Sequence, residues 1–212
     1  KTGQSRPFHA EADGLVPAEG AGMVALKRLA DARRDGDHIY GVIRGVGLSN
    51  DGRGRGFLAP LVSGQERAIS AAYTMSGVSP SEVSLLECHA TGTTVGDATE
   101  IKSTAAVYAG LKDVAMGSLK SNMGHLITTA GVAGLVKTLE ALRHQQRAPT
   151  LHIEKVNPEI AGSPFRLLDS LEAWPSEGVR TAGISAFGFG GNNAHLIVSE
   201  EHPSIVASAP VN

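Results

Sequence analysis

Three clusters of histidine, lysine, threonine, asparagine and glycine carry the residue types that could do chemistry in this sequence. They are His89–Thr93, Lys120–His125 and Phe187–His195, and each follows a short apolar run. A histidine directly after an apolar strand sits at the carboxyl end of that strand, where open α/β sheets place their ligands. The three clusters together therefore predict a binding or catalytic site at one edge of a sheet.

In the first cluster, His89 is followed by Thr91 and Thr93, whose hydroxyls could line an extended ligand. The alternative is a simple capped loop between a strand and a helix, with Asp97 as the N-cap of that helix. Both interpretations remain open from the residues alone.

In the second cluster, His125 lies just before the most strongly amphipathic helical segment. Unpaired N–H groups and the positive end of the helix dipole disfavour an imidazolium there, so a neutral histidine is expected. Such a histidine can donate a hydrogen bond to a developing negative charge. Lys120 could hold a nearby carboxylate, and Glu100 is the candidate. The alternative is a surface lysine beside a helix-capping loop.

In the third cluster, glycines flank the single ring of Phe189. They allow a sharp turn that could bring a main-chain N–H to a reacting oxygen, although a glycine-rich hairpin would look the same. The Lys-Ser/Thr pair and helix of a phosphate-binding loop are missing. We expect His195 to organise this loop by hydrogen bonding.

The elements that must position these clusters alternate between strand and helix. Strands are expected at 20–29, 39–48, 83–88, 114–119, 184–187 and 194–199, and helices at 63–76, 98–108 and 126–145, with a flexible loop at 51–56. This alternation predicts an α/β domain with a buried mixed sheet.

Composition narrows the function classes. The 212 residues are 42% hydrophobic and 19% charged, enough to bury a core. Nineteen Lys and Arg against 21 Asp and Glu give a net charge of −2, which argues against binding nucleic acid through its phosphates. The only cysteine, Cys88, excludes an internal disulfide framework and fits a reducing cytosol. No histidine pair has metal-ligand spacing, so no metal site is predicted. No apolar run could span a bilayer, and a cytoplasmic protein is expected.

The clusters, in this order, resemble the C-terminal half of a β-ketoacyl synthase, and most closely the ketosynthases of modular polyketide synthases. The family pattern His-Gly-Thr-Gly-Thr appears at His89–Thr93, with alanine replacing the first glycine. Gly-Asp-x-x-Glu appears at Gly96–Glu100 and Lys-x-Asn-x-Gly-His at Lys120–His125. Gly-Phe-Gly-Gly-Thr-Asn-x-His appears at Gly188–His195, with asparagine replacing the threonine.

This resemblance implies a thiolase-like layered α/β fold with a mixed β-sheet, working as a dimer. Residues 1–199 would be the C-terminal part of the ketosynthase domain, and 200–212 a Pro/Ala/Ser-rich linker or tail. The implied activity is decarboxylative Claisen condensation, in which malonyl on an acyl carrier protein loses carbon dioxide and attacks an acyl thioester on a cysteine.

By motif matching, His89 and His125 would hydrogen-bond the malonyl thioester oxygen and stabilise the enolate, while Lys120 and Glu100 would orient that pair. The other implied roles are contact with the pantetheine arm by Thr91 and Thr93, oxyanion hole and gating by Phe189 and Gly190, and support by Asp97, Asn122, Asn193 and His195.

The resemblance implies no cofactor bound by the chain itself, because the phosphopantetheine arm is carried by the acyl carrier protein. The implied partners are that carrier protein, the N-terminal half of the ketosynthase, and a second ketosynthase-like chain in a homodimer or heterodimer. No nucleic acid or membrane partner is implied.

The family's nucleophilic cysteine lies well upstream of this region, and Cys88 is not expected to replace it. Cys88 is next to His89 in a strand, where neighbouring side chains point to opposite faces, so we expect a buried thiol in the core. The chain would then hold the decarboxylation half of the site. The acylation half would come from an absent N-terminal part.

We accordingly expect a 3-oxoacyl-[acyl-carrier-protein] synthase type of acyltransferase that is inactive in condensation as this isolated chain. Its exposed apolar surface would make it self-associate. Two alternatives remain open: a non-condensing partner of the chain-length-factor or decarboxylase type, and a non-enzymatic scaffold that docks carrier protein.

Overall fold

A six-stranded mixed sheet organises the computed structural model, which describes residues 2–53, 56 and 59–207. The helices are α1 (Leu29–Asp35), α2 (Val62–Ser76), α3 (Thr94–Val107), α4 (Lys120–Met123) and α5 (Ala130–His144). The strands are β1 (Val42–Asn50), β2 (Leu85–Glu87), β3 (Val114–Gly117), β4 (Gln146–Arg147), β5 (Phe165–Leu167), β6 (Glu172–Ala173), β7 (Thr181–Phe187) and β8 (Asn192–Ser199). Short 3₁₀ turns are η1 (Pro80–Glu82), η2 (Ile127–Thr129), η3 (Pro158–Ile160) and η4 (Phe189–Gly191).

The strand order brings the three polar clusters to one edge of the sheet. The order is β1-β8-β7-β2-β3-β5, in which β7, β2, β3 and β5 run parallel and β8 and β1 are antiparallel to their neighbours. Parallel strands end at the same edge. The segments that follow β2, β3 and β7 are the three clusters, so all of them leave the sheet side by side.

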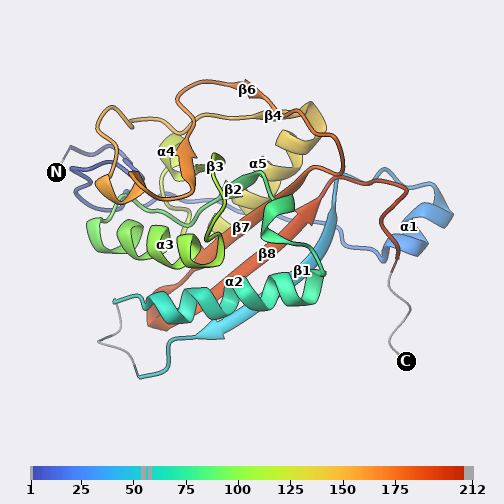
Figure 1. The fold of residues 1–212 in the computed structure, drawn as a ribbon, viewed down its shortest axis with the longest axis horizontal. Coiled ribbons are helices and arrows are strands. Elements are labelled where there is room, and N and C mark those ends of the chain that lie inside the picture. The colour runs from blue at the N-terminus through green and yellow to red at the C-terminus, as the bar shows by residue number, and fades with distance from the viewer. Residues whose placement is uncertain (1, 54–55, 57–58, 208–212) are drawn as a thin grey trace.

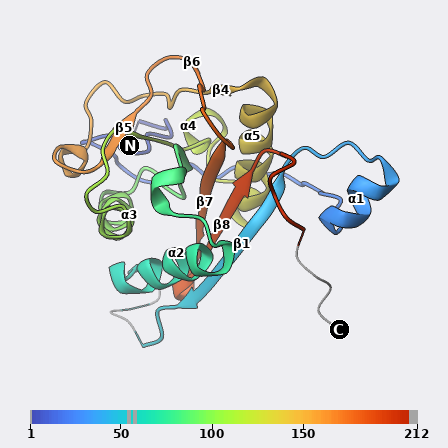
Figure 2. The same ribbon diagram turned by 45° about the vertical axis from the view of Figure 1, so that its right-hand side comes forward.

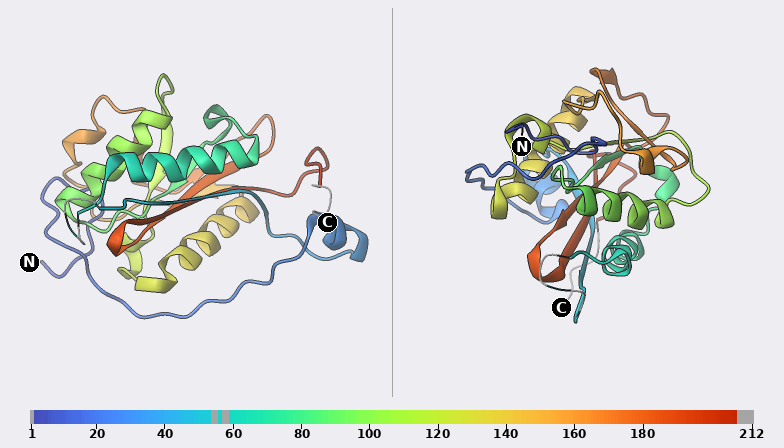
Figure 3. Two further views of the ribbon diagram at one scale, coloured as in Figure 1. Left: turned by 90° about the horizontal axis from the view of Figure 1, so that it is seen from below. Right: turned by 90° about the vertical axis from the view of Figure 1, so that its left-hand side faces the viewer.

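The sheet lies between two layers of helices, as Figure 1 and Figure 2 show. Helices α2 and α3 cover one face and α5 covers the other (Figure 3). Alternation along β2 fills both layers: Leu85 packs in the cluster of Leu135 from α5, whereas Leu86 packs with Ile69 and Ile101 from α2 and α3. Cys88 is 3% exposed within the latter cluster, so the prediction of a buried core thiol is confirmed.

Strand β1 and helix α2 approach each other through small residues. Gly45 and Gly47 are buried on β1 and face the backbone of α2 around Ala68 and Ala72. A Cβ atom on Gly47 would overlap the carbonyl oxygen of Ala68. The glycines are therefore required for this close packing and not for a turn.

We expect Gly47→Val to destabilise the fold by about 3 kcal/mol, because a branched side chain must push α2 off the sheet. Gly178→Ala is the matched control, since a Cβ there meets nothing within 4 Å. Urea unfolding followed by circular dichroism measures both variants. Equal stability of the two would contradict this account of the packing.

Most predicted elements are present, with shifted ends. The predicted helix 63–76 is α2, and the predicted strands 83–88 and 114–119 contain β2 and β3. The long helix starts only at Ala130, because Gly124 and Ile127 have positive φ angles (77° and 52°) that no α-helix can contain. Helix α3 starts at Thr94, four residues earlier than predicted.

The strand predicted at 20–29 is absent. Within the described residues, this stretch is extended and exposed until α1 begins at Leu29, and Met23 is 98% exposed. Figure 3 shows it running beneath α5, away from the sheet. Its apolar pattern is that of a strand, but a strand needs a hydrogen-bonded neighbour, and none lies beside it in the described part of the chain.

The final segment is held at its start. Glu200 pairs with Arg180 at 3.0 Å and Glu201 with Arg33 at 2.7 Å. The last part of the predicted tail, 208–212, and part of the predicted 51–56 loop lie outside the described residues. Of the helices in the described ranges, none combines the length and the apolar character needed to cross a membrane.

Candidate active site

The two predicted histidines lie together. The ring centroids of His89, after β2, and His125, after α4, are 5.1 Å apart with an interplanar angle of 82°. His125 is 7% exposed and His89 is half-buried. The juxtaposition expected from separate loops is thus present in the fold.

The hydrogen bonding of His125 fixes its tautomer. The backbone N–H of Ile127 donates to Nδ1 at 3.2 Å, so Nδ1 must be unprotonated and the ring proton is on Nε2. Burial, and then the charge of Lys120, lower the pKa of His125. At neutral pH this ring is therefore a neutral donor through Nε2–H.

His89 is neutral for the same reasons. Burial, followed by the charges of Lys120 and His125, holds its pKa well below the usual 6.5. Its Nδ1 atom is buried and has no hydrogen-bond partner among the described residues. Its backbone N–H donates to Glu100 Oε1 at 2.8 Å, and this bond holds the backbone of His89 in place.

The expected ion pair between Lys120 and Glu100 is not formed. Both side chains are buried, but Lys120 Nζ instead donates to the carbonyl oxygen of Cys88 at 3.4 Å. Burial raises the pKa of Glu100 to about 8 and lowers that of Lys120. The Glu100 carboxylate accepts a hydrogen bond from the backbone of the His89 loop. Its interaction with Lys120 is therefore electrostatic, without a direct hydrogen bond.

Asp97, in the first turn of α3, holds the loop of Thr91–Thr93 through hydrogen bonds to its backbone. Its Oδ1 accepts the backbone N–H groups of Thr91 (3.0 Å), Gly92 (3.2 Å) and Thr93 (3.4 Å), and its Oδ2 accepts that of Phe8 (2.8 Å). The proposed N-cap role of Asp97 is wrong, since Thr93 holds that position. The Thr91 and Thr93 hydroxyls lie 3.2 Å apart, and Thr93 is partly exposed.

The glycine-rich turn joins β7 to β8 as a tight antiparallel connection. Gly190 has φ 76°, and Phe189 is 53% exposed at its tip. Asn193 donates to Asp51 Oδ1 at 2.7 Å and to the Gly191 carbonyl at 3.1 Å. Asn122, in the neighbouring cluster, is exposed and accepts the Ser121 hydroxyl at 2.9 Å.

His195 is completely buried, and Nδ1 lies 3.0 Å from Ser185 Oγ across the β7–β8 ladder. Burial lowers its pKa to about 3. A Cβ on Gly183 would come within 2.9 Å of Nε2, so the ring fills the space that this glycine leaves. His195 was expected to organise the glycine-rich turn, but its hydrogen bond joins β7 and β8 within the sheet and does not reach that turn.

Sequence reasoning missed several residues that shape the site. Asp51 accepts from Leu61 N–H (3.0 Å) as well as from Asn193, which ties the loop after β1 to the glycine-rich turn. Phe187 was placed in the third cluster, but its contact with His89, with ring centroids 6.1 Å apart, was not expected. A buried acid in the apolar strand β2, Glu87, was also overlooked, although it stands only two residues before His89.

The N-terminal segment borders both histidine loops. Gly14 N–H donates to Gly92 O at 2.9 Å, His125 N–H to Val16 O at 2.7 Å, and Ala18 N–H to His125 O at 2.9 Å. The backbone approaches closely because Gly124 has no side chain; a Cβ there would lie 2.7 Å from Val16 O.

The arrangement presents two neutral imidazoles beside a buried lysine. One imidazole is a fixed N–H donor, and the lysine adds a positive field. Such a set favours a reaction in which negative charge develops on an oxygen between the rings.

The fold and the arrangement of these residues are those of the β-ketoacyl synthase family. The family model for the beta-ketoacyl synthase C-terminal domain matches residues 40–154, and the N-terminal domain model matches residues 1–32. The chain belongs to this family, and its thiolase-like fold with a mixed sheet is confirmed by solved ketosynthases. The predicted family and fold class are therefore both confirmed.

Within the family, the relatives are polyketide synthases. The chain is 44% identical over 206 residues to a phenolphthiocerol/phthiocerol polyketide synthase component of Mycobacterium tuberculosis, covering 94% of this chain and 11% of that protein. Ketosynthase twelve of the bacillaene polyketide synthase of Bacillus amyloliquefaciens superposes with a TM-score of 0.91 at 40% identity, over 94% of this chain and 37% of that one. The module 1 ketosynthase of the same system gives 0.92 at 38% identity, over 95% and 39%. The chain thus spans little more than a third of a solved ketosynthase.

Proposed function

We propose that this chain supplies the decarboxylation half of a polyketide-type ketosynthase site. The observation that supports this most strongly is the pair of neutral imidazoles, His89 and His125, at 5.1 Å, with the Nε2 proton of His125 fixed by Ile127. The family is one of acyl-transferring enzymes, so a scaffold without chemistry is not favoured.

The proposed reaction begins with malonyl on the phosphopantetheine arm of an acyl carrier protein. His89 and His125 donate hydrogen bonds to the thioester oxygen, and the bond between the carboxylate and the α-carbon breaks. Its electron pair forms the enolate and carbon dioxide leaves. The α-carbon then attacks the acyl thioester on a cysteine, and that cysteine leaves as thiolate.

The remaining residues take supporting roles in the proposal. Thr91 and Thr93 offer adjacent hydroxyls to the pantetheine arm, and the backbone around Phe189 and Gly190 offers an N–H to the acyl carbonyl. Asp97, Asn193 and Asp51 hold these two loops in place through the hydrogen bonds described above.

The acyl-accepting cysteine is proposed to come from another segment of the synthase, in a dimeric cytoplasmic assembly. Cys88 is unsuited to the role: its thiol is buried, and burial raises its pKa well above the usual range, so little thiolate forms. The chain alone is accordingly proposed to be inactive in condensation.

The test supplies the chain with malonyl carrier protein and an acyl thioester, with and without an N-terminal ketosynthase half. We expect condensed product only when that half is present. We also expect Cys88→Ala to change the rate of condensation, measured with that half present, by no more than about twofold, because the thiol only packs the core. Condensed product from the chain alone that disappears in Cys88→Ala would overturn the proposal.

A further inference from the structure

Glu87 is a buried carboxylate that the proposed chemistry does not use. It ends β2, is 4% exposed, and points toward α5. Gly134 of α5 makes room for it, since a Cβ there would lie 3.1 Å from Glu87 Cγ. A charged group buried inside a fold is costly unless it is fully paired, so its partners indicate its role.

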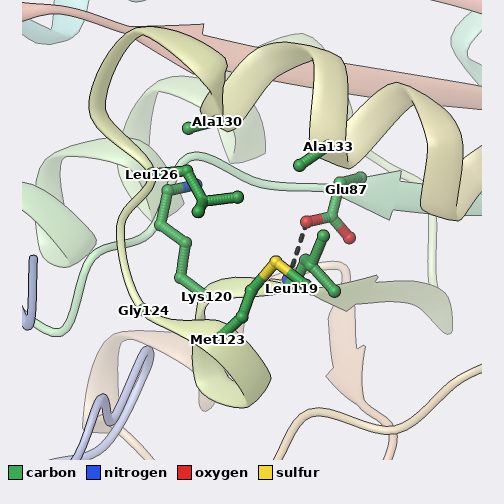
Figure 4. Close-up of a pocket in the computed structure, with 8 residues that line it drawn as sticks. All are labelled: Glu87, Leu119, Lys120, Met123, Gly124, Leu126, Ala130 and Ala133. Atoms are coloured by element: carbon green, nitrogen blue, oxygen red, sulfur yellow. Dashed lines mark hydrogen bonds between the residues drawn. The ribbon is translucent and has the colours of Figure 1, made fainter. Parts of the chain in front are cut away.

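Both oxygens of Glu87 are occupied. Oε2 accepts Lys137 Nζ of α5 at 2.6 Å. Oε1 accepts the backbone N–H of Leu119 at 2.7 Å, the bond drawn as a dashed line in Figure 4. Leu119 is the residue from which α4 begins, and Lys120 follows directly. The carboxylate therefore clamps the turn that carries Lys120 against α5.

Glu87 and Lys120 also line one small cavity, shown in Figure 4. The rest of its wall is Leu119, Met123, Gly124, Leu126, Ala130 and Ala133. In such apolar surroundings a charge is weakly screened. Of the groups whose ionised forms raise the pKa of Lys120 against burial, Glu87 comes first, followed by Glu100, Cys88 and Asp97.

The titratable groups around Lys120 come from every neighbouring element. They are Glu87 and Cys88 from β2 and its end, Glu100 and Asp97 from α3, His89 and His125 from the two loops, and Lys137 of α5 behind Glu87. Lys120 in turn lowers the pKa of both imidazoles. The link from Glu87 to the histidines therefore runs through the proton of Lys120, and a change at Glu87 should act in the alkaline range where Lys120 loses that proton.

We propose that Glu87, together with Lys137, is a positioning residue of the active site: it fixes the Lys120 turn and keeps Lys120 protonated beside the histidine pair. The inference rests on the proposed decarboxylation. Glu87 does not touch the substrate in this account, because its oxygens are already bound inside the fold.

The test measures decarboxylation of malonyl carrier protein against pH in the ketosynthase completed by its nucleophile-bearing half. Glu87→Gln keeps an acceptor for Leu119 but removes the charge. We expect the alkaline limb of the pH–rate profile of this variant to move down by about one pH unit, because Lys120 loses its proton more easily. The acid limb, which reports the imidazoles, and KM should stay in place.

Lys137→Gln is the second variant and has the opposite sign. It leaves the Glu87 charge without its partner, so the alkaline limb should move to higher pH. Glu140→Gln, an exposed acid on the same helix, is the matched control. A merely structural role would lower thermal stability in both variants without moving the limbs.

The outcomes separate this inference from the proposed function. If the wild-type enzyme does not decarboxylate malonyl carrier protein, the proposed function fails. If the wild type is active and both variants keep its alkaline limb, the role of Glu87 is overturned. If Glu87→Gln does not fold, Lys137→Gln alone decides: a shift of its alkaline limb to higher pH supports the role of Glu87, and an unchanged or lower limb overturns it.

Discussion

His125→Ala is expected to lower the rate of malonyl decarboxylation by about 10²–10³-fold, the cost of removing one fixed donor to a developing oxyanion. The donor is Nε2–H, which is oriented because Ile127 N–H occupies Nδ1. Substrate affinity should change little, since the hydrogen bond strengthens only as negative charge forms.

The matched control is His144→Ala, which removes an exposed histidine from the end of α5. Release of carbon dioxide from carboxyl-labelled malonyl carrier protein gives the rate for each variant. The double variant lacking His89 as well should be little slower than either single one, because the two rings act on one oxygen. A loss below about threefold in His125→Ala would show that the ring is not a donor in the reaction.

The wild-type rate should also fall in acid, and the sign follows from the pKa shifts. Burial and Lys120 lower the pKa of both histidines, so each stays neutral to a pH below 6.5. Below that range, protonation of His125 would place an N–H at Nδ1 against the N–H of Ile127. The loss of activity in acid should therefore be centred below pH 6.5, the pKa of an unperturbed histidine.

Glu100→Gln is expected to stabilise the fold at pH 8 and to leave it nearly unchanged at pH 4. Burial raises the pKa of Glu100 from 4.5 to about 8, so the folded state binds its proton more tightly than the unfolded state does. The stability from this group is fully present below pH 4.5 and is lost as the pH rises through about 8. The full difference is on the order of 5 kcal/mol.

Other groups titrate in different windows. The pKa values of His89, His125 and His195 are lowered, so their contributions are complete above pH 6.5 and are lost only as the pH falls. Asp97, with its pKa raised to about 6, weakens the fold between about 4 and 6. Between pH 6.5 and 8, the fall in wild-type stability should therefore come mainly from Glu100.

Urea unfolding at half-unit steps of pH measures the free energy of unfolding of both proteins. The difference between them isolates Glu100, and the exposed Glu140→Gln should give a flat difference. If wild type and Glu100→Gln lose stability in parallel from pH 6.5 to 8, Glu100 is ionised in the fold throughout this range.

Local patterns in the sequence were enough to predict that the candidate residues meet at one edge of the sheet. The apolar runs before His89, Lys120 and the glycine-rich turn predicted strands, and parallel strands end at a common edge, so the clusters had to converge. The small and apolar residues of α2 recur at helical spacing, which predicted 63–76 correctly. The motifs identified the family because their order and spacing are specific.

The tertiary structure decided which charged groups meet. Lys120 could have reached Glu100 on sequence grounds, but the α3 carboxylate is taken by His89 N–H, and Lys120 bonds to the carbonyl of Cys88. Glu87 finds Leu119 and Lys137 at separations of 32 and 50 residues. Such partners depend on how β2, β3 and α5 pack, and no local pattern records that packing.

The residue types and spacing in the chain determined the family, the α/β class and the two imidazoles, because strand ends and motifs are local properties. Only the fold decided which groups of the site are charged and which residues hold them in place. Burial sets the pKa shifts of Glu100, Lys120 and the histidines, and burial is a property of the whole packed chain. The segment at 20–29 shows the same limit, since an apolar pattern becomes a strand only where a neighbouring strand pairs with it.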